Sequence, residues 1–291
     1  GEVIPLILLE LLLRKMKYYG FHFYKLEKIY MKDNKNFKDD FLFLLNKIKT
    51  QESFAFTRFS DGEQYILDNI ELKLDQNLIQ IGSQHQSGPY KPVDFKHFDP
   101  KKHAYHRNLL VESFLHKQHN YFKGIGCPCC NGHEYKINQL NVLGGDSDDL
   151  TWANLWVNGN YPDFIKKVLP ELYNNKCVMI CHKDANLDKL PFIKKDFRVG
   201  YNAMVNNLDV IEKIKIWIKE NKIINHIFLF SASSFSNIAI YELFKTNTNN
   251  TFIDIGTCLT PMMNTPTERD YLQGYWTYKG SKSLNLICKW N

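Results

Sequence analysis

The chain has 291 residues, of which 44% are hydrophobic and 23% are charged, and its net charge at pH 7 is +6. These values are typical of a soluble globular protein with one large domain or two ordinary ones. A chain of this length can bury a sizeable core, so neither disulfides nor a structural metal is needed for its stability. The modest positive charge suits an anionic partner such as a nucleotide diphosphate, although a solvated lysine surface is the simpler explanation.

The cysteine content indicates a reducing compartment. Seven is an odd number for a disulfide framework. Four of these residues stand among apolar neighbours, as reduced core cysteines do; they are Cys177, Cys181, Cys258 and Cys288. We therefore expect a cytoplasmic protein.

The N-terminal segment is apolar but short. Residues 3–13 include Glu10, follow no basic region and fall short of the roughly 20 apolar residues that cross a bilayer. An amphipathic helix over residues 3–30 is expected instead, with Leu, Tyr and Phe on one face and Lys on the other. It can pack on the core, on a second copy in a homo-oligomer, or on a membrane surface.

A polar break at residues 31–37 separates an N-terminal helical extension, 1–35, from a single domain, 36–291. Within that domain the apolar spacing predicts helices and strands in alternation. The helices are expected at residues 38–49, from 63 onward, and at 148–157, 161–173, 207–220 and 234–246. The strands are expected at residues 53–57, 122–125, 140–143, 176–181, 223–230 and 251–255.

This alternation predicts the fold class. Strands separated by helices of 10 to 15 residues favour an α/β fold with a mainly parallel sheet and flanking helices. Residues 176–181 and 223–230 are continuous apolar runs, as in strands buried on both faces. In such sheets ligands bind in the loops at the carboxyl ends of the strands.

The loop after the first expected strand carries the first candidate site. Asp61 and Glu63 flank Gly62, so two carboxylates can converge while the backbone turns tightly. Hard divalent cations prefer oxygen ligands, and Arg58 stands where its guanidinium can grip a phosphate oxygen. The same residues also make an ordinary turn and helix start, with Ser60 or Asp61 as the N-cap.

The stretch Phe56-Thr-Arg-Phe-Ser-Asp-Gly-Glu63 resembles the signature of the GT-D-type glycosyltransferases. Weaker similarities follow in the same order along the chain, so that the resemblance spans roughly residues 45–260. They are Trp152–Trp156 with Asn160-Tyr161, Cys177–Cys181, Phe228–Ser234 and Phe252–Gly256. Two features depart from the family: Ser60 stands where a glycine is usual, and the acidic and aromatic tail common in bacterial members does not follow Gly256.

The resemblance implies a GT-D-like fold with a Rossmann-like nucleotide-binding core. It implies a hexosyltransferase that uses Mn²⁺ or Mg²⁺ and moves a sugar from a nucleotide diphosphate, with a UDP-sugar as the expected donor, to an acceptor hydroxyl. Asp61 and Glu63 are then the metal-motif carboxylates, with Asp61 also a catalytic residue. The acceptor, a glycan, a lipid-linked sugar or a protein, is left open.

Serines follow the apolar strand that ends near Phe230. Ser233, Ser234 and Ser236 lead into a helix, where free backbone N–H groups can meet a donor phosphate. A helix-capping turn without a ligand is the alternative explanation, with about equal weight.

An acidic run, Asp146, Asp148 and Asp149, precedes the helix expected from residue 150. One of these carboxylates, with Asp148 as first choice, can act as the base that deprotonates the acceptor. Helix capping explains the run equally simply.

Two further segments are expected near the site. Cys127, Cys129, Cys130 and His133 are too closely spaced for a usual zinc site, so a glycine-rich loop beside the active site is favoured. Residues 84–100 are expected to form a long loop over the site that selects the acceptor.

Two other functions compete with glycosyl transfer. A phosphotransferase or nucleotide hydrolase is disfavoured because neither a Gly-rich Lys-Ser/Thr phosphate loop nor a dinucleotide glycine fingerprint is present. A non-enzymatic carbohydrate-binding or nucleic-acid-binding protein would use the 5 tryptophans and 16 tyrosines for stacking. Nucleic acid is not expected as a partner, because no basic stripe interleaved with aromatic residues occurs.

Overall fold

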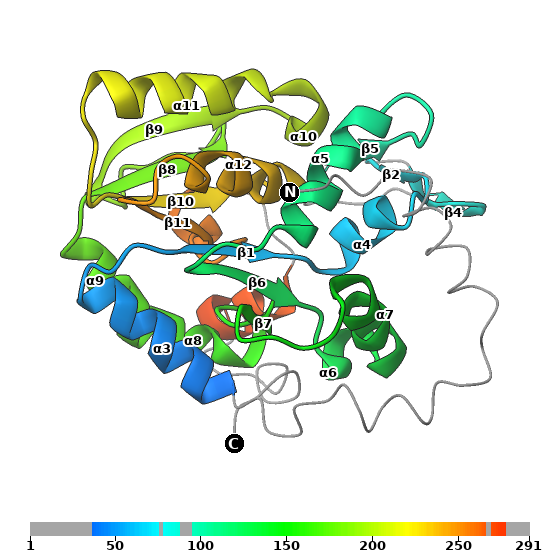
Figure 1. Cartoon of the computed structure of the whole chain (residues 1–291), viewed down its shortest axis with the longest axis horizontal. Helices are drawn as coiled ribbons and strands as arrows, with labels where there is room; N and C mark the ends of the chain where they lie inside the picture. The colour runs from blue at the N-terminus through cyan, green and yellow to red at the C-terminus, as the bar shows by residue number, and fades with distance from the viewer. Residues whose placement is uncertain (1–36, 76–77, 88–94, 266–268, 278–291) are drawn as a thin grey trace.

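The structure is a computed structural model that describes residues 37–75, 78–87, 95–265 and 269–277 (Figure 1). The predicted helix over residues 3–30 lies outside these residues. The division of the chain into 1–35 and 36–291 stays a prediction. No helix of the described residues is both long and apolar enough to cross a membrane.

Seven parallel strands form the main sheet, which confirms the predicted α/β fold class. Their order is β7-β6-β1-β11-β10-β8-β9. They are β1 (Ala55–Arg58), β6 (Tyr121–Ile125), β7 (Leu150–Trp152), β8 (Cys177–His182), β9 (Ile193–Val199), β10 (Ile227–Ser231) and β11 (Thr251–Asp254). The interior strand β1 pairs with β6 through Ala55↔Tyr121 and with β11, the central strand, through Ala55↔Phe252. Segments about 200 residues apart in sequence therefore meet in the middle of the sheet.

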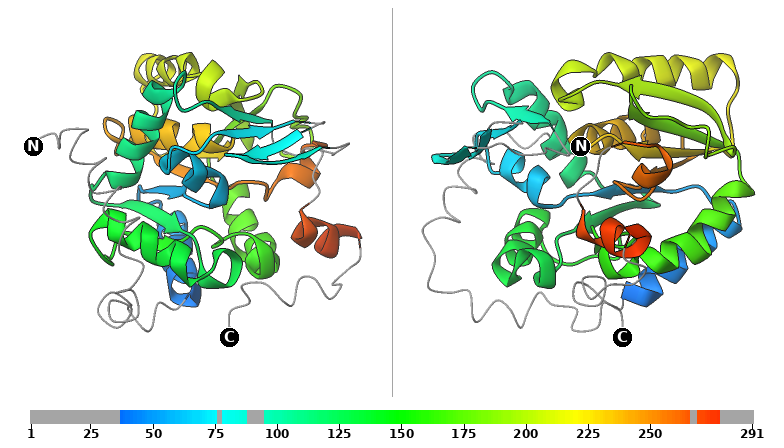
Figure 2. Two further views of the ribbon diagram at one scale, coloured as in Figure 1. Left: turned by 90° about the vertical axis from the view of Figure 1, so that its right-hand side faces the viewer. Right: turned by 180° about the vertical axis from the view of Figure 1, so that it is seen from behind.

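Helices cover both faces of this sheet (Figures 1 and 2). One face packs on α5 (Ala104–Leu115), α7 (His133–Leu143), α11 (Asp209–Glu220) and α12 (Ser234–Phe244). The other face packs on α3 (Phe37–Lys49) and on the continuous helical segment α8 (Tyr161–Asp163), η2 (Phe164–Val168) and α9 (Leu169–Tyr173). The apolar runs of β8 and β10 are buried for this reason.

A second, antiparallel sheet of four short strands lies on the side of the molecule where the carboxyl end of β1 lies (Figure 2). Its order is β4-β3-β2-β5, and the strands are β2 (Leu72–Leu74), β3 (Leu78–Ile81), β4 (Gln84–Ser87) and β5 (Lys96–Phe98). The long loop predicted for residues 84–100 was therefore wrong in part, since β4 and β5 fall within it. β4 and β5 are short and mostly polar, and neighbouring strands rather than local periodicity fix their pairing.

Two predicted elements were of the wrong type. Residues 140–143, expected as a strand, are the last turn of α7, because Leu140 and Leu143 lie three apart on a buried helix face and Gly144 ends the helix with φ +80°. Residues 148–157, expected as a helix, contain strand β7, whose Leu150 pairs with Lys123 of β6, followed by turns. The edge strand β9 and helix α5 were not predicted.

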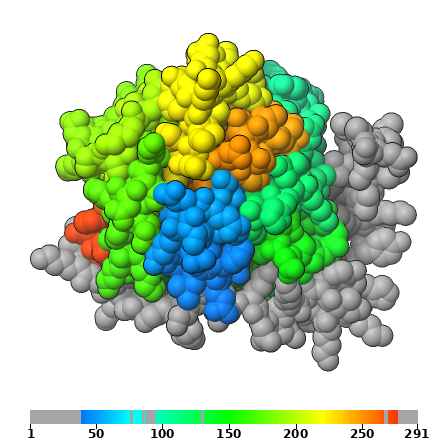
Figure 3. Space-filling model, turned by 60° about the vertical axis from the view of Figure 1, so that its left-hand side comes forward, coloured from blue at the N-terminus to red at the C-terminus, as the bar shows by residue number. Residues whose placement is uncertain are grey.

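The amino ends of the main-sheet strands lie on the side of the molecule opposite to their carboxyl ends. Figure 3 shows this side, with α3 in blue below α11 in yellow and the orange segment that follows α12. It is closed by packed helices and turns, so the carboxyl ends of the strands are the side on which to look for a ligand.

Candidate functional site

The strands β1, β10 and β11 end side by side at Arg58, Ser231 and Asp254. After β1 the chain forms β6 and β7 on one side of it in the sheet, and the later strands β8 and β9 lie on the other side. The direction in which strands are added to the sheet is thus reversed next to β1. Open α/β sheets bind their ligands outside the carboxyl ends of the strands at such a reversal. A cavity of about 320 Å³ opens there. Its charged lining residues are Arg58, Asp61, Glu63, Lys96, Asp254 and Arg269.

Arg58 and Asp254 form one charged pair of this cavity. Arg58 Nη1 lies 3.9 Å from Asp254 Oδ1, and the Nε–H of Arg58 donates to the carbonyl oxygen of Ala153. The backbone N–H of Gly256 donates to Asp254 Oδ1 at 2.8 Å. Gly256 has φ +52°, and a Cβ there would lie 2.0 Å from Arg58 Nη1, so glycine is required for the arginine to reach Asp254.

The carboxyl group of Asp254 is suited to exchange protons. Burial raises its pKa to about 6, although the Arg58 guanidinium and the Gly256 N–H act in the opposite direction. Within the described residues, no hydrogen bond or ion pair engages Asp254 Oδ2, and Asp254 lines the cavity. A carboxylate with this pKa can serve as a general base near neutral pH.

Glu63 is the hub of a second network. Its Oε2 accepts hydrogen bonds from the Ser60 backbone N–H and hydroxyl at 3.2 and 3.1 Å, which forms the capping box of α4 (Asp61–Leu67). Its Oε1 accepts from the Ser234 hydroxyl at 2.7 Å and from Lys96 Nζ at 3.3 Å. Burial alone would raise the pKa of Glu63, but Lys96 and the two serine hydroxyls outweigh it and hold the pKa below its usual value.

Asp61 and Glu63 differ in their fitness to hold a divalent cation. The Asp61 side chain is exposed, lines the cavity and has no hydrogen bond or ion pair within the described part of the chain. Both oxygens of Glu63 are already engaged, one of them by the Lys96 ammonium. The described residues hold no group of three His, Cys, Asp or Glu side chains that suits a metal. Asp61 therefore fits a metal that takes its other ligands from phosphate and water, whereas Glu63 does not fit as a ligand.

The three predicted phosphate-binding serines have different surroundings. Ser233 is exposed and lines the cavity. The Ser234 hydroxyl is buried against Glu63, and the buried Ser236 hydroxyl accepts a hydrogen bond from the Ala232 N–H. Only Ser233 has a hydroxyl in position for a ligand, and the other two stabilise the turn from β10 into α12.

Asp148 is not brought to the cavity. It precedes β7, at the amino end of the sheet, whereas the cavity residue Ala153 follows the carboxyl end of the same strand. Its neighbour Asp149 forms an ion pair with the buried Lys123 at 3.1 Å. The acidic run is therefore placed to serve the structure on the far side of the sheet.

The cysteine-rich segment does lie beside the site, as expected. Cys127 is buried and lines the cavity together with Asn131, but the residues between them form the short helix α6 (Pro128–Asn131) rather than a loop.

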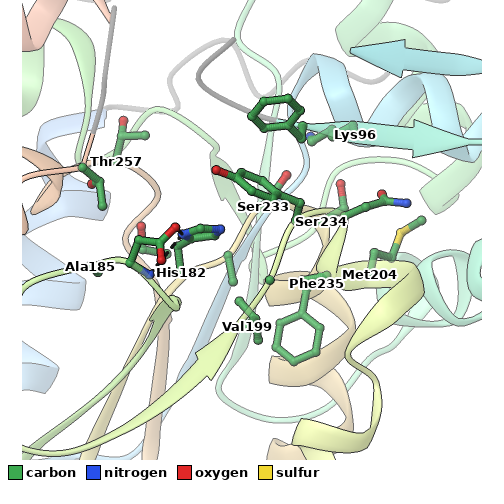
Figure 4. Close-up of a pocket in the computed structure, with 18 of the residues that line it drawn as sticks. Lys96, His182, Ala185, Val199, Met204, Ser233, Ser234, Phe235 and Thr257 are labelled. Atoms are coloured by element: carbon green, nitrogen blue, oxygen red, sulfur yellow. Dashed lines mark hydrogen bonds and ion pairs between the residues drawn. The ribbon is translucent and has the colours of Figure 1, made fainter. Parts of the chain in front are cut away.

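A larger cavity of about 470 Å³ adjoins the first one, at the ends of β8, β9 and β10 (Figure 4). Val199 and Phe235 form part of its apolar lining, and His182 and Tyr201 lie on its wall with ring centroids 4.5 Å apart. The two cavities have a common set of lining residues: Lys96, Ser231, Ala232, Ser233 and Thr257. Lys96 and Ser233 thus stand on the wall between them.

Lys96, Asp254 and Arg269 are the charged residues of the smaller cavity to which the sequence analysis assigned no role. Asp254 directly ends an apolar strand, so the rule of strand ends was a usable signal. Lys96 had no such signal, because it reaches the cavity from the small antiparallel sheet, which was not predicted.

Comparisons with known proteins identify distant structural likenesses. No family model and no curated protein matches the chain. Among solved structures, a selenomethionine-substituted structure of domain of unknown function 1792 is similar with a TM-score of 0.49 and 10% identity. A second structure, in which domain 1792 is described as having a distinct glycosyltransferase fold, is similar with a TM-score of 0.47 and 12% identity. Each likeness covers 76% of this chain and 80% of the other.

Proposed function

We propose that the chain is a glycosyltransferase of the hexosyltransferase type, which moves a sugar from a nucleotide diphosphate to an acceptor hydroxyl. The observation that carries this proposal is the pairing of Arg58 with the buried Asp254 in a cavity that also holds Lys96. The cavity thus combines cations for a diphosphate with a carboxyl group of raised pKa for an acceptor. The resemblance of residues 56–63 to the GT-D signature supports the same reaction.

The cations account for the leaving group. When the bond between the sugar and the diphosphate breaks, negative charge develops on the leaving phosphate oxygen. Arg58, Lys96 and Arg269 all line the cavity, and fixed cations in a partly buried site stabilise such charge strongly. The exposed Ser233 hydroxyl supplies a neutral donor on the same wall.

Asp254 accounts for the acceptor. In the proposed step the acceptor hydroxyl oxygen forms a bond to the anomeric carbon of the sugar as the bond from that carbon to the diphosphate oxygen breaks. The hydroxyl proton passes to Asp254, and the electron pair of the broken bond stays on the nucleotide diphosphate. Asp254 replaces Asp148 as the proposed base, because Asp254 lines the cavity and Asp148 does not.

One residue of the cavity suits a metal ion in this reaction. Asp61 would hold Mn²⁺ or Mg²⁺, which would supply positive charge beside the diphosphate. Glu63 positions Lys96 instead of binding the metal, since the two side chains form an ion pair. The remaining functions stay with the residues of the chain: Lys96 and Arg58 bind the phosphates, and Asp254 accepts the proton.

The test is incubation of the protein with a panel of nucleotide sugars, UDP-sugars first, in the presence and absence of Mn²⁺ and Mg²⁺. Slow transfer to water should release the nucleotide diphosphate and free sugar. A nucleotide hydrolase, the principal alternative, would release a nucleoside monophosphate and a sugar phosphate. Thermal stabilisation without any product would indicate a binding protein, and no response to any donor would overturn the proposal.

A further inference from the structure

We infer that the larger cavity binds the nucleoside half of the donor, with the diphosphate lying across the wall that the two cavities share. This assignment rests on the proposed function and adds to it the direction in which the donor lies. The sugar and the acceptor then occupy the smaller cavity, beside Asp254.

The first support is the aromatic wall of the larger cavity. Tyr201 follows β9, is 52% exposed and packs against two other lining rings, with centroid distances of 4.4 Å to Phe95 and 4.5 Å to His182. Phe95 and His182 hold the Tyr201 ring in place, while half of its surface remains open. A fixed, open aromatic ring is a stacking platform for a planar base.

The second support is the distribution of charge. Among the described lining residues of the larger cavity, Lys96 is the one lysine or arginine, and it belongs to the shared wall. The smaller cavity adds Arg58 and Arg269. A diphosphate is therefore attracted to the smaller cavity and its boundary, and the uncharged base and ribose are left for the larger one.

The third support is the position of a carboxylate that can accept hydrogen bonds. Asp184 lies on the wall of the larger cavity, and its carboxylate is 3.4 Å from His182 Nδ1. This carboxylate would repel a phosphate, but it can accept hydrogen bonds from ribose hydroxyls. Val199 and Phe235 add apolar surface to the same cavity (Figure 4). The polar and apolar surfaces thus match a ribose and a base respectively.

The test compares two ligands that share the diphosphate and differ in the nucleoside. Binding of UDP and of pyrophosphate is measured by calorimetry for the parent protein and for Tyr201→Ala, Tyr201→Phe and Tyr105→Ala. Tyr105 is 65% exposed on α5 and lines neither cavity, so it controls for the loss of an exposed tyrosine. Both rings are surface-exposed, so neither alanine variant leaves a core cavity.

We expect Tyr201→Ala to weaken UDP binding about tenfold and to leave pyrophosphate binding unchanged. Tyr201→Phe, which keeps the ring, and Tyr105→Ala should bind UDP like the parent. If Tyr201→Ala binds UDP as the parent does, or loses pyrophosphate equally, the inference is overturned while the proposed function stands. If neither UDP nor any other nucleotide diphosphate binds the parent, the proposed function fails and the inference with it.

Discussion

Lys96 Nζ lies 3.3 Å from Glu63 Oε1, and the two side chains, 13% and 7% exposed, come from different parts of the fold. Lys96 belongs to β5 of the small antiparallel sheet, whereas Glu63 lies on α4, directly after strand β1 of the main sheet. The pair therefore fixes the small sheet to the site. It also puts a lysine cation where the sequence led us to expect a metal ion.

Replacement of Glu63 by alanine should destabilise the protein by about 3–5 kcal/mol, because it removes the carboxylate that neutralises the largely buried Lys96 ammonium group. The double variant Glu63→Ala/Lys96→Met should recover much of this loss. Urea unfolding measures the change in free energy. Asp209→Ala, which breaks the exposed pair with Lys213, is the matched control and should cost less than about 1 kcal/mol. Equal effects of the two single variants would contradict a buried pair.

Asp254→Asn should lower the turnover of a donor substrate by about 10²–10⁴-fold while UDP still binds, because the amide cannot accept the acceptor proton. Initial-rate assays and calorimetry on the same preparation separate turnover from binding. Asp163→Asn changes an exposed carboxylate that pairs with Lys167, and it should have no effect. A turnover of Asp254→Asn within twofold of the parent would remove Asp254 from the mechanism.

The activity should depend on pH through Asp254. Its base form is required, so kcat/KM should rise with pH around a midpoint near 6, the pKa to which burial raises this group. Because this pKa lies above the unfolded value of 3.8, the contribution of Asp254 to stability is complete below about pH 4 and is lost as pH rises through 6.

Arg58→Gln removes the cation that lowers the pKa of Asp254, so the midpoint in kcat/KM should move upward. A pH–rate profile of the variant measures the shift. A profile that only falls in height, at an unchanged midpoint, would mean that Arg58 acts on the phosphates alone.

Asp61→Asn should abolish any stimulation of donor turnover by Mn²⁺ or Mg²⁺, since Asp61 is the carboxylate of the motif that is exposed in the cavity. Glu63→Gln keeps the size and one accepting oxygen of that side chain and should retain the stimulation. Turnover is measured with EDTA and across a titration of each metal. Loss of the metal response in Glu63→Gln alone would favour a ligand role for Glu63 instead.

Ser233→Gly should raise stability by about 1 kcal/mol. Ser233 has φ +54° and ψ −147°, a strained conformation for a residue with a Cβ and an easy one for glycine. Thermal and urea unfolding measure the change. Ser231→Gly, at the end of β10, is the control and should destabilise, because glycine gains nothing there and adds freedom to the unfolded chain. A destabilised Ser233→Gly would show that the hydroxyl matters more than the strain.

The sequence predicted five of the seven strands of the main sheet, because these strands carry their own signal. β8 and β10 are apolar runs, and the Asp61-Gly62 segment that begins helix α4 marks the end of β1. The four short strands of the small sheet had no such signal, since their pairing depends on each other. Helix α7 was mistaken for a strand at its end, where a short apolar run does not distinguish the two.

The site was predictable only in part for a related reason. Position after a strand identified Asp61 and Ser233 correctly as residues of the cavity. It could not show that the Ser234 hydroxyl would donate a hydrogen bond to Glu63 and so be unavailable to a ligand, because the two residues are 171 apart in sequence. Asp148 was misjudged because the strand that follows it was taken for a helix, which reversed its position relative to the sheet.

The pairing of β1 with β11 has a consequence for the order of synthesis. Arg58 is made early, but its partner Asp254 and the strand that joins β1 to β10 emerge from the ribosome almost 200 residues later. Long-range strand pairing of this kind is intrinsically slow to form. A nascent chain that ends before residue 254 therefore has an incomplete central sheet and no site, so the completed fold and a binding-competent cavity arise in the same late event.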